Sequence, residues 1–303
     1  MLAALLCASL LVPLPGDTAV LLIRVLDVSD ARIGGDAILI TDSAGGRARH
    51  LLIDASDHGD SVAALLRRFG VDTLAAVILS HPHADHYGGM PVVLDRFPVR
   101  RFIYGGTPRT LRTYVGLLDE IAGLHIPVVT ADTGVRTVTL VTGDDTIDLQ
   151  ILAPPPDCRR LPRAATGHDI NNCSVGVRLT RGAFTMLLPG DAEELELGWW
   201  MMLHAALLRA DVLKAGHHGS SNGTTATLLD VVQPRAVLIS ANGRQHPFAE
   251  VLTMLAARGI PTYCTADAGT ITVRAPRGGA WSITTQRAAK CHARTVLRSE
   301  GNP

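Results

Sequence analysis

Four short apolar segments of this sequence are each followed by histidine or aspartate residues, and this repeated arrangement restricts the possible folds more than any other feature. The segments span residues 74–79, 184–190, 211–213 and 236–240. Short apolar runs bounded by turn residues are typical of buried β-strands. In layered α/β proteins the carboxyl ends of several strands meet at one edge, where ligands bind. The sequence therefore predicts an α/β fold with a polar site at that edge.

The densest polar cluster is SHPHADHYGG, residues 80–89, which directly follows the first apolar segment. Along an extended chain His81 and His83 point to the same side, and Asp85 and His86 follow after a bend. Each pair could hold one cation. Imidazole and carboxylate together suit zinc, manganese or iron, whereas calcium prefers oxygen ligands alone. The alternative is a solvated polar loop, because His, Asp and Gly all favour turns.

The other three segments are followed by further candidates. These are Asp191 after residues 184–190, His217 and His218 after residues 211–213, and Asn242 and His246 after residues 236–240. Each of them alone is more typical of a turn or a surface than of a site. Together, at one edge of the predicted sheets, they favour two cations bridged by one carboxylate, because such a bridge offsets the repulsion between the ions.

Strand and helix patterns divide the chain into two similar halves. Strands are predicted at 20–28, 36–41, 50–55, 136–140, 147–152, 174–191 (a hairpin that turns at Arg181 and Gly182) and near 261–264, 269–274 and 280–284. Helices are predicted at 60–70, 109–125, 193–210, 224–232 and 247–258. Each half has strands followed by helices, which predicts two packed sheets with helices outside them. Residues 153–169, rich in proline and arginine, are expected to form a surface loop. Because no linker is evident, residues 19–286 are expected to form one domain.

The two ends of the chain differ from this domain. Residues 1–18 are largely apolar but shorter than the roughly 20 residues that a membrane-spanning helix needs. No basic residue precedes Arg24, so a weak export signal, a remnant of a membrane helix and a misassigned start all stay open. The localisation, cytoplasmic or exported and membrane-associated, stays open with them. Residues 287–303 are basic and are expected to be disordered.

Composition limits the classes of partner and the redox chemistry. The chain has 28 basic and 28 acidic residues, which argues against a general attraction to nucleic acid or anionic membranes. Local basic patches, within residues 159–163 and in the tail, remain candidate binding surfaces. The 5 cysteines are odd in number and include no C-x-x-C pair, so no disulfide framework is expected.

The motif HPHADH has the form H-x-H-x-D-H, and in it the sequence resembles the metallo-β-lactamase superfamily of hydrolases. The closer resemblance is to the C-terminal hydrolase domain of ComEC-type competence proteins, which act in DNA uptake. It runs from about residue 20 to 285, through GGDAILI, LLIDA, NNCSVGVRL, LLPGDAE, LKAGHHGSSN and ISANGRQHP in that order. The resemblance implies a four-layer αββα sandwich with two divalent metal ions, zinc or, as the alternative, manganese.

The resemblance also implies roles for individual residues. His81 and His83 would hold the first metal, Asp85 and His86 the second, Asp191 would bridge them, and His217 or His218 would complete the second site. Asp54 would support the metal-binding loop from behind. Many superfamily members supply a further histidine to the first metal, where this sequence has Asn171 and Asn172, and His168 is a candidate substitute. The usual competence motif DVGQGD reads DVSDARIGGD here, so this loop is longer.

We predict from these features a metal-dependent hydrolase of phosphoester bonds, in particular phosphodiesters of nucleic acid or nucleotides. Asp85 could orient an attacking hydroxide, Lys214 could stabilise negative charge, and His246 could protonate the leaving oxygen. The candidate phosphate contacts are Ser220, Ser221 and Asn242. The alternatives are a lactonase or β-lactamase acting on C–O or C–N bonds, and a noncatalytic metal-stabilised DNA-binding module. The natural substrate and the oligomeric state stay open.

Overall fold

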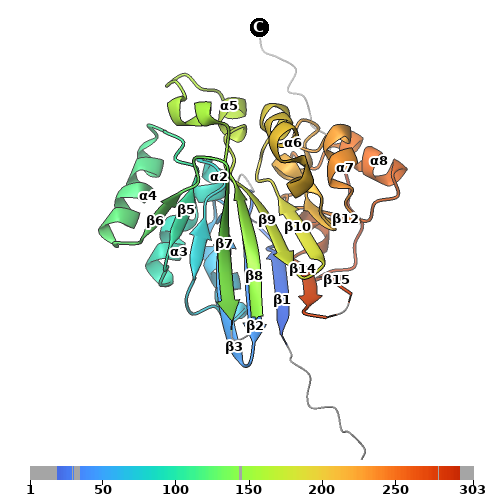
Figure 1. Cartoon of the computed structure of the whole chain (residues 1–303), viewed down its shortest axis with the longest axis horizontal. Coiled ribbons are helices and arrows are strands. Elements are labelled where there is room, and N and C mark those ends of the chain that lie inside the picture. Colours follow the sequence, from blue (N-terminus) through green and yellow to red (C-terminus); the bar gives the residue numbers. More distant parts are fainter. Residues whose placement is uncertain (1–18, 29, 31–34, 143–144, 279, 294–303) are drawn as a thin grey trace, which may run out of the picture.

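The computed structural model describes residues 19–28, 30, 35–142, 145–278 and 280–293. Within these residues two β-sheets pack face to face, and helices cover the outer face of each sheet (Figure 1). The predicted α/β class and the four-layer αββα arrangement are therefore confirmed. The expectations for residues 1–18 and 294–303 lie outside the described residues. Among the described helices, none has the length and apolar character that crossing a bilayer requires.

The first sheet has eight strands within the described residues, in the order β15-β14-β1-β2-β3-β4-β5-β6. Their bounds are β1 Val20–Val25, β2 Ile38–Ala44, β3 Arg47–Ile53, β4 Ala76–Ile78, β5 Phe102–Tyr104, β6 Val128–Thr130, β14 Ile271–Pro276 and β15 Ser282–Thr285. Strands β3 to β6 are parallel, whereas the remaining pairs are antiparallel. The polar residues that follow β3 and β4 therefore lie at one edge of this sheet.

The second sheet has seven strands within the described residues, in the order β13-β12-β11-β10-β9-β8-β7. Their bounds are β7 Val135–Thr142, β8 Asp145–Leu152, β9 Gly176–Arg181, β10 Phe184–Leu188, β11 Val212–Lys214, β12 Ala236–Ile239 and β13 Thr262–Cys264. Strands β10 to β13 are parallel. The β9–β10 hairpin turns where the sequence predicted, at Gly182, whose φ of 55° is one that glycine adopts without strain.

Helices cover the two outer faces because each has one buried apolar side. The longer helices are α1 Gly59–Arg68, α3 Met90–Arg96, α4 Arg112–Gly123, α6 Glu194–Leu208, α7 Ala226–Val232 and α8 Ala249–Ala257. The short ones are α2 Ala84–Tyr87, α5 Gly167–Asn171, α9 Thr265–Ala268 and the 3-10 turns η1 Pro156–Arg160 and η2 Gly216–Gly219. Helices α1, α3 and α4 pack on the first sheet and α6, α7 and α8 on the second (Figure 1).

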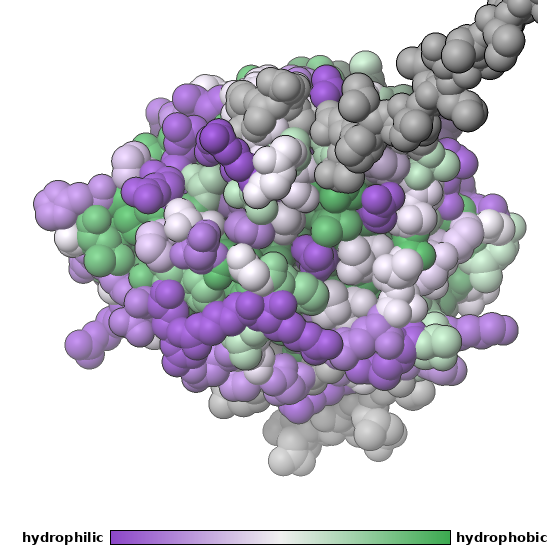
Figure 2. Space-filling view, turned by 90° about the horizontal axis from the view of Figure 1, so that it is seen from below, coloured by the Kyte–Doolittle hydropathy of each residue, from purple (hydrophilic) through white to green (hydrophobic). Residues whose placement is uncertain are grey.

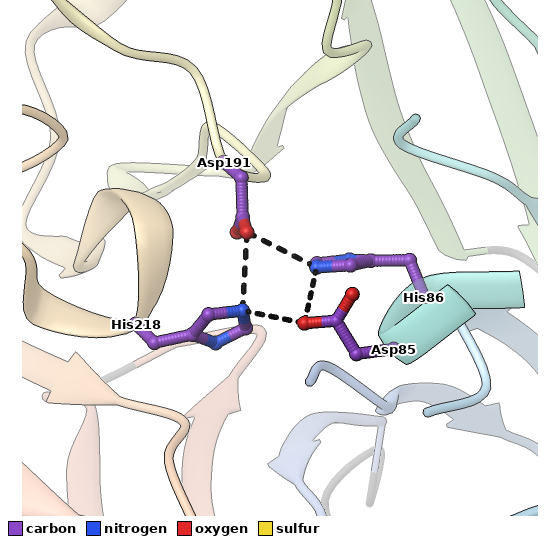
Figure 3. Close-up of side chains that lie close together, drawn as sticks. All are labelled: Asp85, His86, Asp191 and His218. Atoms are coloured by element: carbon purple, nitrogen blue, oxygen red, sulfur yellow. Dashed lines mark hydrogen bonds and ion pairs between the residues drawn. The ribbon is translucent and has the colours of Figure 1, made fainter. Parts of the chain in front are cut away.

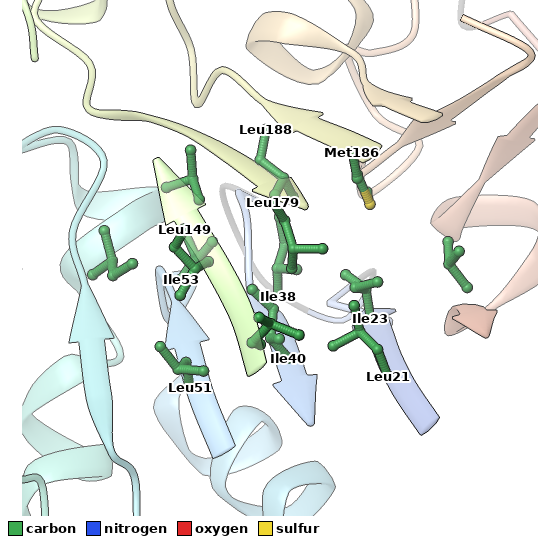
Figure 4. Close-up of a cluster of buried hydrophobic side chains, with 14 of the residues drawn as sticks. Leu21, Ile23, Ile38, Ile40, Leu51, Ile53, Leu149, Leu179, Met186 and Leu188 are labelled. Atoms are coloured by element: carbon green, nitrogen blue, oxygen red, sulfur yellow. The ribbon is translucent and has the colours of Figure 1, made fainter. Parts of the chain in front are cut away.

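The main core lies between the two sheets (Figure 4). In β1 the residues alternate, so that Leu21 and Ile23 are fully buried while Leu22 is only half-buried. Ile38 and Ile40 of the neighbouring β2 extend the same inner layer. Burying one such aliphatic side chain contributes about 1.5–3 kcal/mol, so this layer supplies much of the rigidity on which the rim of the sandwich is built.

Two disulfides correct the expectation that the cysteines form none. Cys158 of η1 is bonded to Cys173, and Cys264 of β13 is bonded to Cys291, with Cα–Cα distances of 5.5 and 5.3 Å. Sequence spacing did not indicate these pairs because each joins segments that only the tertiary fold brings together. The Cys158–Cys173 bond constrains the segment 153–169 that was expected to be a surface loop, and this segment also contains η1 and the start of α5.

The second disulfide bears on the chain's basic tail. Residues 287–293, part of the segment expected to be disordered, are placed against the body of the protein. Cys291 is held by its bond to Cys264, and the Arg287 guanidinium lies 3.2 Å from Asp27. His292 Nδ1 lies 3.2 Å from Asp267. This part of the tail is therefore tied to the edge of the fold.

A cationic surface lies at the end that carries the β2–β3 hairpin, although the net charge is zero. Figure 2 views the molecule from this end, where hydrophilic side chains form a broad band. Exposed arginines line two adjoining hollows of about 380 and 360 Å³; they are Arg47, Arg49, Arg100 and Arg101. The N-terminal ends of the parallel strands β4 and β5 point toward this surface, so it lies opposite the rim on which the polar clusters meet.

Candidate metal centre

The parallel strands of both sheets end at a common rim, and polar residues follow several of them. Asp54 follows β3, and the HPHADH segment follows β4. Asp191 follows β10, and the two histidines of η2 follow β11. Helix α2 begins directly after His83, so the bend expected from the sequence is one helical turn. Gly89 permits this turn to lie close to β3, because a Cβ there would stand 2.1 Å from the carbonyl oxygen of Ala55.

Four side chains from three separate segments converge on the rim (Figure 3). Asp85, His86, Asp191 and His218 each offer one ligand atom, and these atoms all lie within 4.8 Å of one another. Asp191 Oδ2 is 3.1 Å from His86 Nε2 and 3.1 Å from His218 Nε2. Asp85 Oδ2 is 3.6 Å from His218 Nε2. Two imidazoles and two carboxylates at this spacing form a donor set suited to zinc or manganese.

The structure distinguishes between the two adjacent histidines. Both have left-handed backbones, with φ of 45° at His217 and 53° at His218, which turns the two side chains in different directions. His218 Nδ1 donates to the carbonyl oxygen of Ser240 at 3.0 Å, so its Nε2 faces the cluster. Within the described residues, this buried Nε2 makes no hydrogen bond of good geometry, as expected for a nitrogen that ligates a cation. His217 instead lies 3.0 Å from Glu193.

The other predicted pair lies beside this cluster but is less complete. His81 Nε2 is 3.0 Å from His83 Nδ1 and 4.0 Å from Asp191 Oδ2. Neither histidine belongs to a described group of three or more ligand atoms within 4.8 Å, and neither does His168. His168 pairs with Glu193 at 2.8 Å. Two imidazoles and the shared carboxylate are thus the ligands that the described residues offer to a first cation.

Asn172, the other position considered for that cation, contributes to local structure instead. Its side-chain oxygen accepts from the backbone of Glu196 at 3.0 Å, in the first turn of α6. Its amide donates to the carbonyl oxygen of His168 at 2.9 Å. Asn171 is buried and donates to Glu193 Oε1 at 2.8 Å. The NNCS segment therefore organises the loops around the rim through hydrogen bonds.

Asp54 holds the metal-binding loop from beneath. It accepts hydrogen bonds from the Ser80 backbone at 2.8 Å, from the Ser80 hydroxyl at 2.6 Å and from His86 Nδ1 at 2.7 Å. Burial raises the pKa of Asp54, and the charge of His86 opposes that rise. The bond to Nδ1 orients His86 so that its Nε2 faces Asp191.

Lys214 lies beneath the cluster, in the interior of the protein. Its side chain is fully buried, and its ammonium donates to the Gly190 carbonyl oxygen at 3.1 Å. It forms an ion pair with Asp36 and lies 3.5 Å from Asp191 Oδ1. Because β11 ends beneath the cluster and directs the side chain into the protein, the Lys214 ammonium lies against the carboxylates of Asp36 and Asp191, and a contribution of its charge to the reaction stays a prediction.

Sequence reasoning missed two carboxylates that contact the predicted site. Asp36 lies two residues before the start of β2 and is 1% exposed, and its Oδ1 is 3.5 Å from His218 Nδ1. Glu193 accepts from Asn171 and pairs with two histidines, His168 and His217. A signal was present, because both belong to motifs that carry the family resemblance, GGDAILI and LLPGDAE. Neither motif, however, shows which loop its carboxylate meets.

The remaining candidates lie around the mouth of the cluster. The His246 ring stacks on Phe248, with centroids 4.9 Å apart, and lies 5.3 and 5.8 Å from the rings of His217 and His218. Burial, with the charges of these two histidines, lowers the pKa of His246 to about 3, so a neutral ring faces the site. A neutral ring can still donate a hydrogen bond to a phosphate oxygen, and the role of His246 as a general acid stays a prediction.

Three polar loop residues have local partners or lie at the surface. Ser220 is buried and bonds within its own loop to Asn222. Ser221 is exposed. Asn242 accepts from the Arg244 backbone at 3.1 Å. Of the three, Ser221 is thus the one whose exposure fits a substrate contact.

Electrostatics in the cluster favour a cation. Burial opposes ionisation of Asp191, yet the charges of His218, His86 and Lys214 hold its pKa well below the usual range. Burial likewise opposes protonation of His86 and His218, but Asp191 and its neighbouring carboxylates raise their pKa values well above 6.5. The imidazoles therefore hold protons where the carboxylates concentrate negative charge. A divalent cation would replace those protons, as metal binding to histidine requires.

Comparison with known proteins agrees with this geometry. Residues 32–244 match the family described as the metallo-beta-lactamase superfamily. ComE operon protein 3 of Bacillus subtilis is 30% identical over 210 residues, which are 68% of this chain and 25% of that protein. Recombination protein 2 of Haemophilus influenzae is 31% identical over 205 residues, 64% of this chain and 21% of that protein. The chain thus spans about a quarter of the length of these relatives.

Solved structures support the fold. Tm1679, titled a metal-dependent hydrolase of the beta-lactamase superfamily, has a TM-score of 0.51 at 14% identity, covering 80% of this chain and 94% of that one. A mutant of the CmlA beta-hydroxylase has a TM-score of 0.52, also at 14% identity, covering 87% of this chain and 55% of that one. The shared fold alone therefore does not determine the reaction. The family match over residues 32–244, together with the clustered histidines and aspartates, shows that this chain belongs to the metallo-β-lactamase superfamily.

Proposed function

We propose that this protein is a metal-dependent phosphodiesterase that acts on nucleic acid or nucleotides. The observation that carries the proposal is the convergence of Asp85, His86, Asp191 and His218, beside the His81–His83 pair. The relative named Recombination protein 2 supports a nucleic-acid substrate. The limited ligand set offered to the first cation also favours this class over lactonases and β-lactamases, in which a further histidine is expected.

The residues of the cluster would divide into holding and reacting groups. His86, Asp191 and His218 are at most 6% exposed, whereas the Asp85 side chain is 19% exposed. When bound, a pair of divalent cations supplies Lewis-acid activation of water and of a phosphoryl oxygen. The charges of His86 and His218 keep the pKa of Asp85 low although burial opposes this, so its carboxylate stays ionised and can accept a hydrogen bond from an attacking water.

The histidines at the mouth would contact the substrate. The His217 side chain is 21% exposed and is oriented by Glu193, 3.0 Å from its Nδ1. His246 lies beside it, and His83 lies beside His81, 3.0 Å from its Nε2. Ring nitrogens at these positions can donate to, or accept from, the oxygens of a phosphodiester and its leaving group. This arrangement would bind the substrate at an open rim rather than in a closed pocket.

The experiment is a substrate screen of the full chain purified with manganese or zinc. We expect hydrolysis of bis-p-nitrophenyl phosphate and of single-stranded DNA, and loss of both in the double variant His81→Asn, Asp85→Asn. The matched control changes the same residue types at the exposed positions His125→Asn and Asp119→Asn, far from the rim, and should stay active.

Three outcomes would contradict the proposal. Activity that survives in the double variant would remove these residues from the mechanism. Hydrolysis of nitrocefin or a lactone without phosphodiester hydrolysis would favour C–N or C–O chemistry. One tightly bound ion with no hydrolysis of any substrate would favour a noncatalytic binding module.

A further inference from the structure

A buried ion pair lies directly beneath the candidate metal centre. Asp36 is 1% exposed and Lys214 is fully buried, and they come from opposite sheets of the sandwich. Taking an ammonium and a carboxylate out of water is costly, and apolar residues of the same size often stabilise a fold as well or better. A pair in this position is therefore poorly explained by stability alone.

The loop before β2 delivers Asp36 to this position. Gly35 has a φ of 97°, and a Cβ there would lie 1.6 Å from the carbonyl oxygen of Asp85. The Ser240 hydroxyl donates to the Gly35 carbonyl oxygen at 3.0 Å and ties the loop to the end of β12. The loop thus passes between the two sheets' rims, where a side chain at position 35 would not fit.

Lys214 and Asp36 contact different atoms of the cluster. The ammonium lies 3.5 Å from Asp191 Oδ1 and donates to the carbonyl oxygen of Gly190, the preceding residue. Asp36 Oδ1 lies 3.5 Å from His218 Nδ1. The other oxygen, Asp191 Oδ2, is 3.1 Å from both His86 Nε2 and His218 Nε2. It is also 4.0 Å from His81 Nε2, so it lies between the two predicted ligand sets.

We propose that Lys214 and Asp36 are positioning residues, which would let Asp191 present its Oδ2 to both ligand sets when two cations are bound. The ammonium engages Oδ1, which leaves Oδ2 to face both ligand sets, as its position in Figure 3 between His86 and His218 illustrates. Asp36 balances the charge of Lys214, so that the ammonium does not repel the cations. This inference rests on the proposed metal-dependent function, but it concerns how metal is held and not which bond is cleaved.

The test measures metal binding in three variants of the full chain, Asp36→Asn, Lys214→Met and the double variant. Manganese affinity is measured by chelator competition, and electron paramagnetic resonance distinguishes a coupled pair of ions from single ions. We expect Asp36→Asn to weaken binding about 10- to 100-fold, because it removes the carboxylate that balances the charge of the Lys214 ammonium beside the ions. The double variant should regain affinity for one ion but lack the coupled-pair spectrum, because Asp191 Oδ1 is no longer engaged.

A second buried pair provides the matched control. Arg181 and Asp42 lie 3.3 Å apart in the core between the sheets, with side chains 2% and 0% exposed. Asp42→Asn, Arg181→Met should change the unfolding midpoint and leave the coupled spectrum intact. If a single variant does not fold, the double variant, which contains no unpaired charge, decides the question.

A coupled two-ion spectrum in the double Asp36→Asn, Lys214→Met variant would overturn the inference. So would an affinity in Asp36→Asn equal to that of the wild type. These readouts do not depend on the substrate. If the wild type binds a coupled pair but hydrolyses no phosphodiester, the proposed function fails while the inference stands. If the wild type binds no coupled pair, the inference fails even if hydrolysis is observed.

Discussion

The hydrogen bond between Asp54 and His86 provides a quantitative test of how the cluster is oriented. His86 Nδ1 lies 2.7 Å from Asp54 Oδ2, and an ionised carboxylate only accepts, so a proton stays on Nδ1 and Nε2 is the nitrogen free to ligate a cation. In Asp54→Asn the amide oxygen would keep the bond from the Ser80 backbone, 2.8 Å from Oδ1. The amide NH2 group would then face His86 Nδ1. That nitrogen would have to accept, and the proton would move to Nε2, where it opposes metal binding.

The magnitude follows from this single change. Asp54 has a φ of 57°, a conformation that asparagine also tolerates, so the substitution adds little backbone strain. The size of the side chain at position 54 and its burial are also preserved. The expected effect is that of removing the outer partner of a ligating histidine, about a 10- to 100-fold loss of metal affinity. This corresponds to roughly 1.4 to 2.8 kcal/mol.

The assay is competition for manganese or zinc between the protein and a chromogenic chelator at constant pH. Asp230→Asn is the matched control, because Asp230 is an exposed carboxylate that pairs with Arg258 on the surface. Circular dichroism confirms that each variant folds. A folded Asp54→Asn protein that binds metal as tightly as the wild type would refute the reasoning, because His86 would then be oriented without the carboxylate.

Three further predictions concern other parts of the molecule. His218→Ala should lose bound metal whereas His217→Ala should retain it, because of the two histidines only His218 directs its Nε2 into the cluster. The measurement is the metal content per chain by mass spectrometry, and equal losses in the two variants would contradict the geometry. Burial raises the pKa of Glu196 well above 4.5, so its contribution to stability is complete below pH 4.5 and is lost as pH rises toward the folded-state pKa. Glu196→Gln can still accept the hydrogen bond from the Ser174 backbone, so its unfolding temperature should exceed that of the wild type at alkaline pH and equal it near pH 4.5. If the unfolding temperatures of the two proteins changed with pH in parallel, Glu196 would not be a buried neutral carboxyl. Replacing Cys158 and Cys173 by alanine opens a loop with a sequence separation of 15 and should lower the free energy of unfolding by about 3 kcal/mol. The measurement is unfolding in guanidinium, and an unchanged free energy would mean that the disulfide does not constrain the unfolded chain.

Local patterns predicted most elements of the fold. The hairpin turn at Gly182, the helix at 109–125 and the strand before the HPHADH motif all follow from periodicity and turn residues, which act over a few positions. The structure has α4 over Arg112–Gly123, within the predicted range. The disulfides were not predictable in this way, because Cys264 and Cys291 meet only when the chain folds back on itself.

Some residues of the candidate site were likewise predictable from local patterns, and others were not. His81, His83, Asp85, His86 and Asp191 were named from sequence because each stands at the end of an apolar segment. Glu193 and Asp36 were not, because a carboxylate in a loop motif has no sequence signal for its partner. The direction of the Lys214 side chain was not predictable from the sequence for a related reason. A residue at the end of a short strand can face the solvent or the interior, and only packing decides which.

The amino-acid sequence by itself determined which segments become strands and which polar residues stand at their ends, because strand length and turn chemistry depend on neighbours along the chain. The tertiary structure decided which of these residues meet. With a left-handed backbone at both positions, it directed the side chain of His218, and not that of His217, into the cluster. It also brought Asp36 and Lys214 together across the two sheets. Contacts of this kind join residues far apart in sequence, and they exist only once the two sheets have packed together.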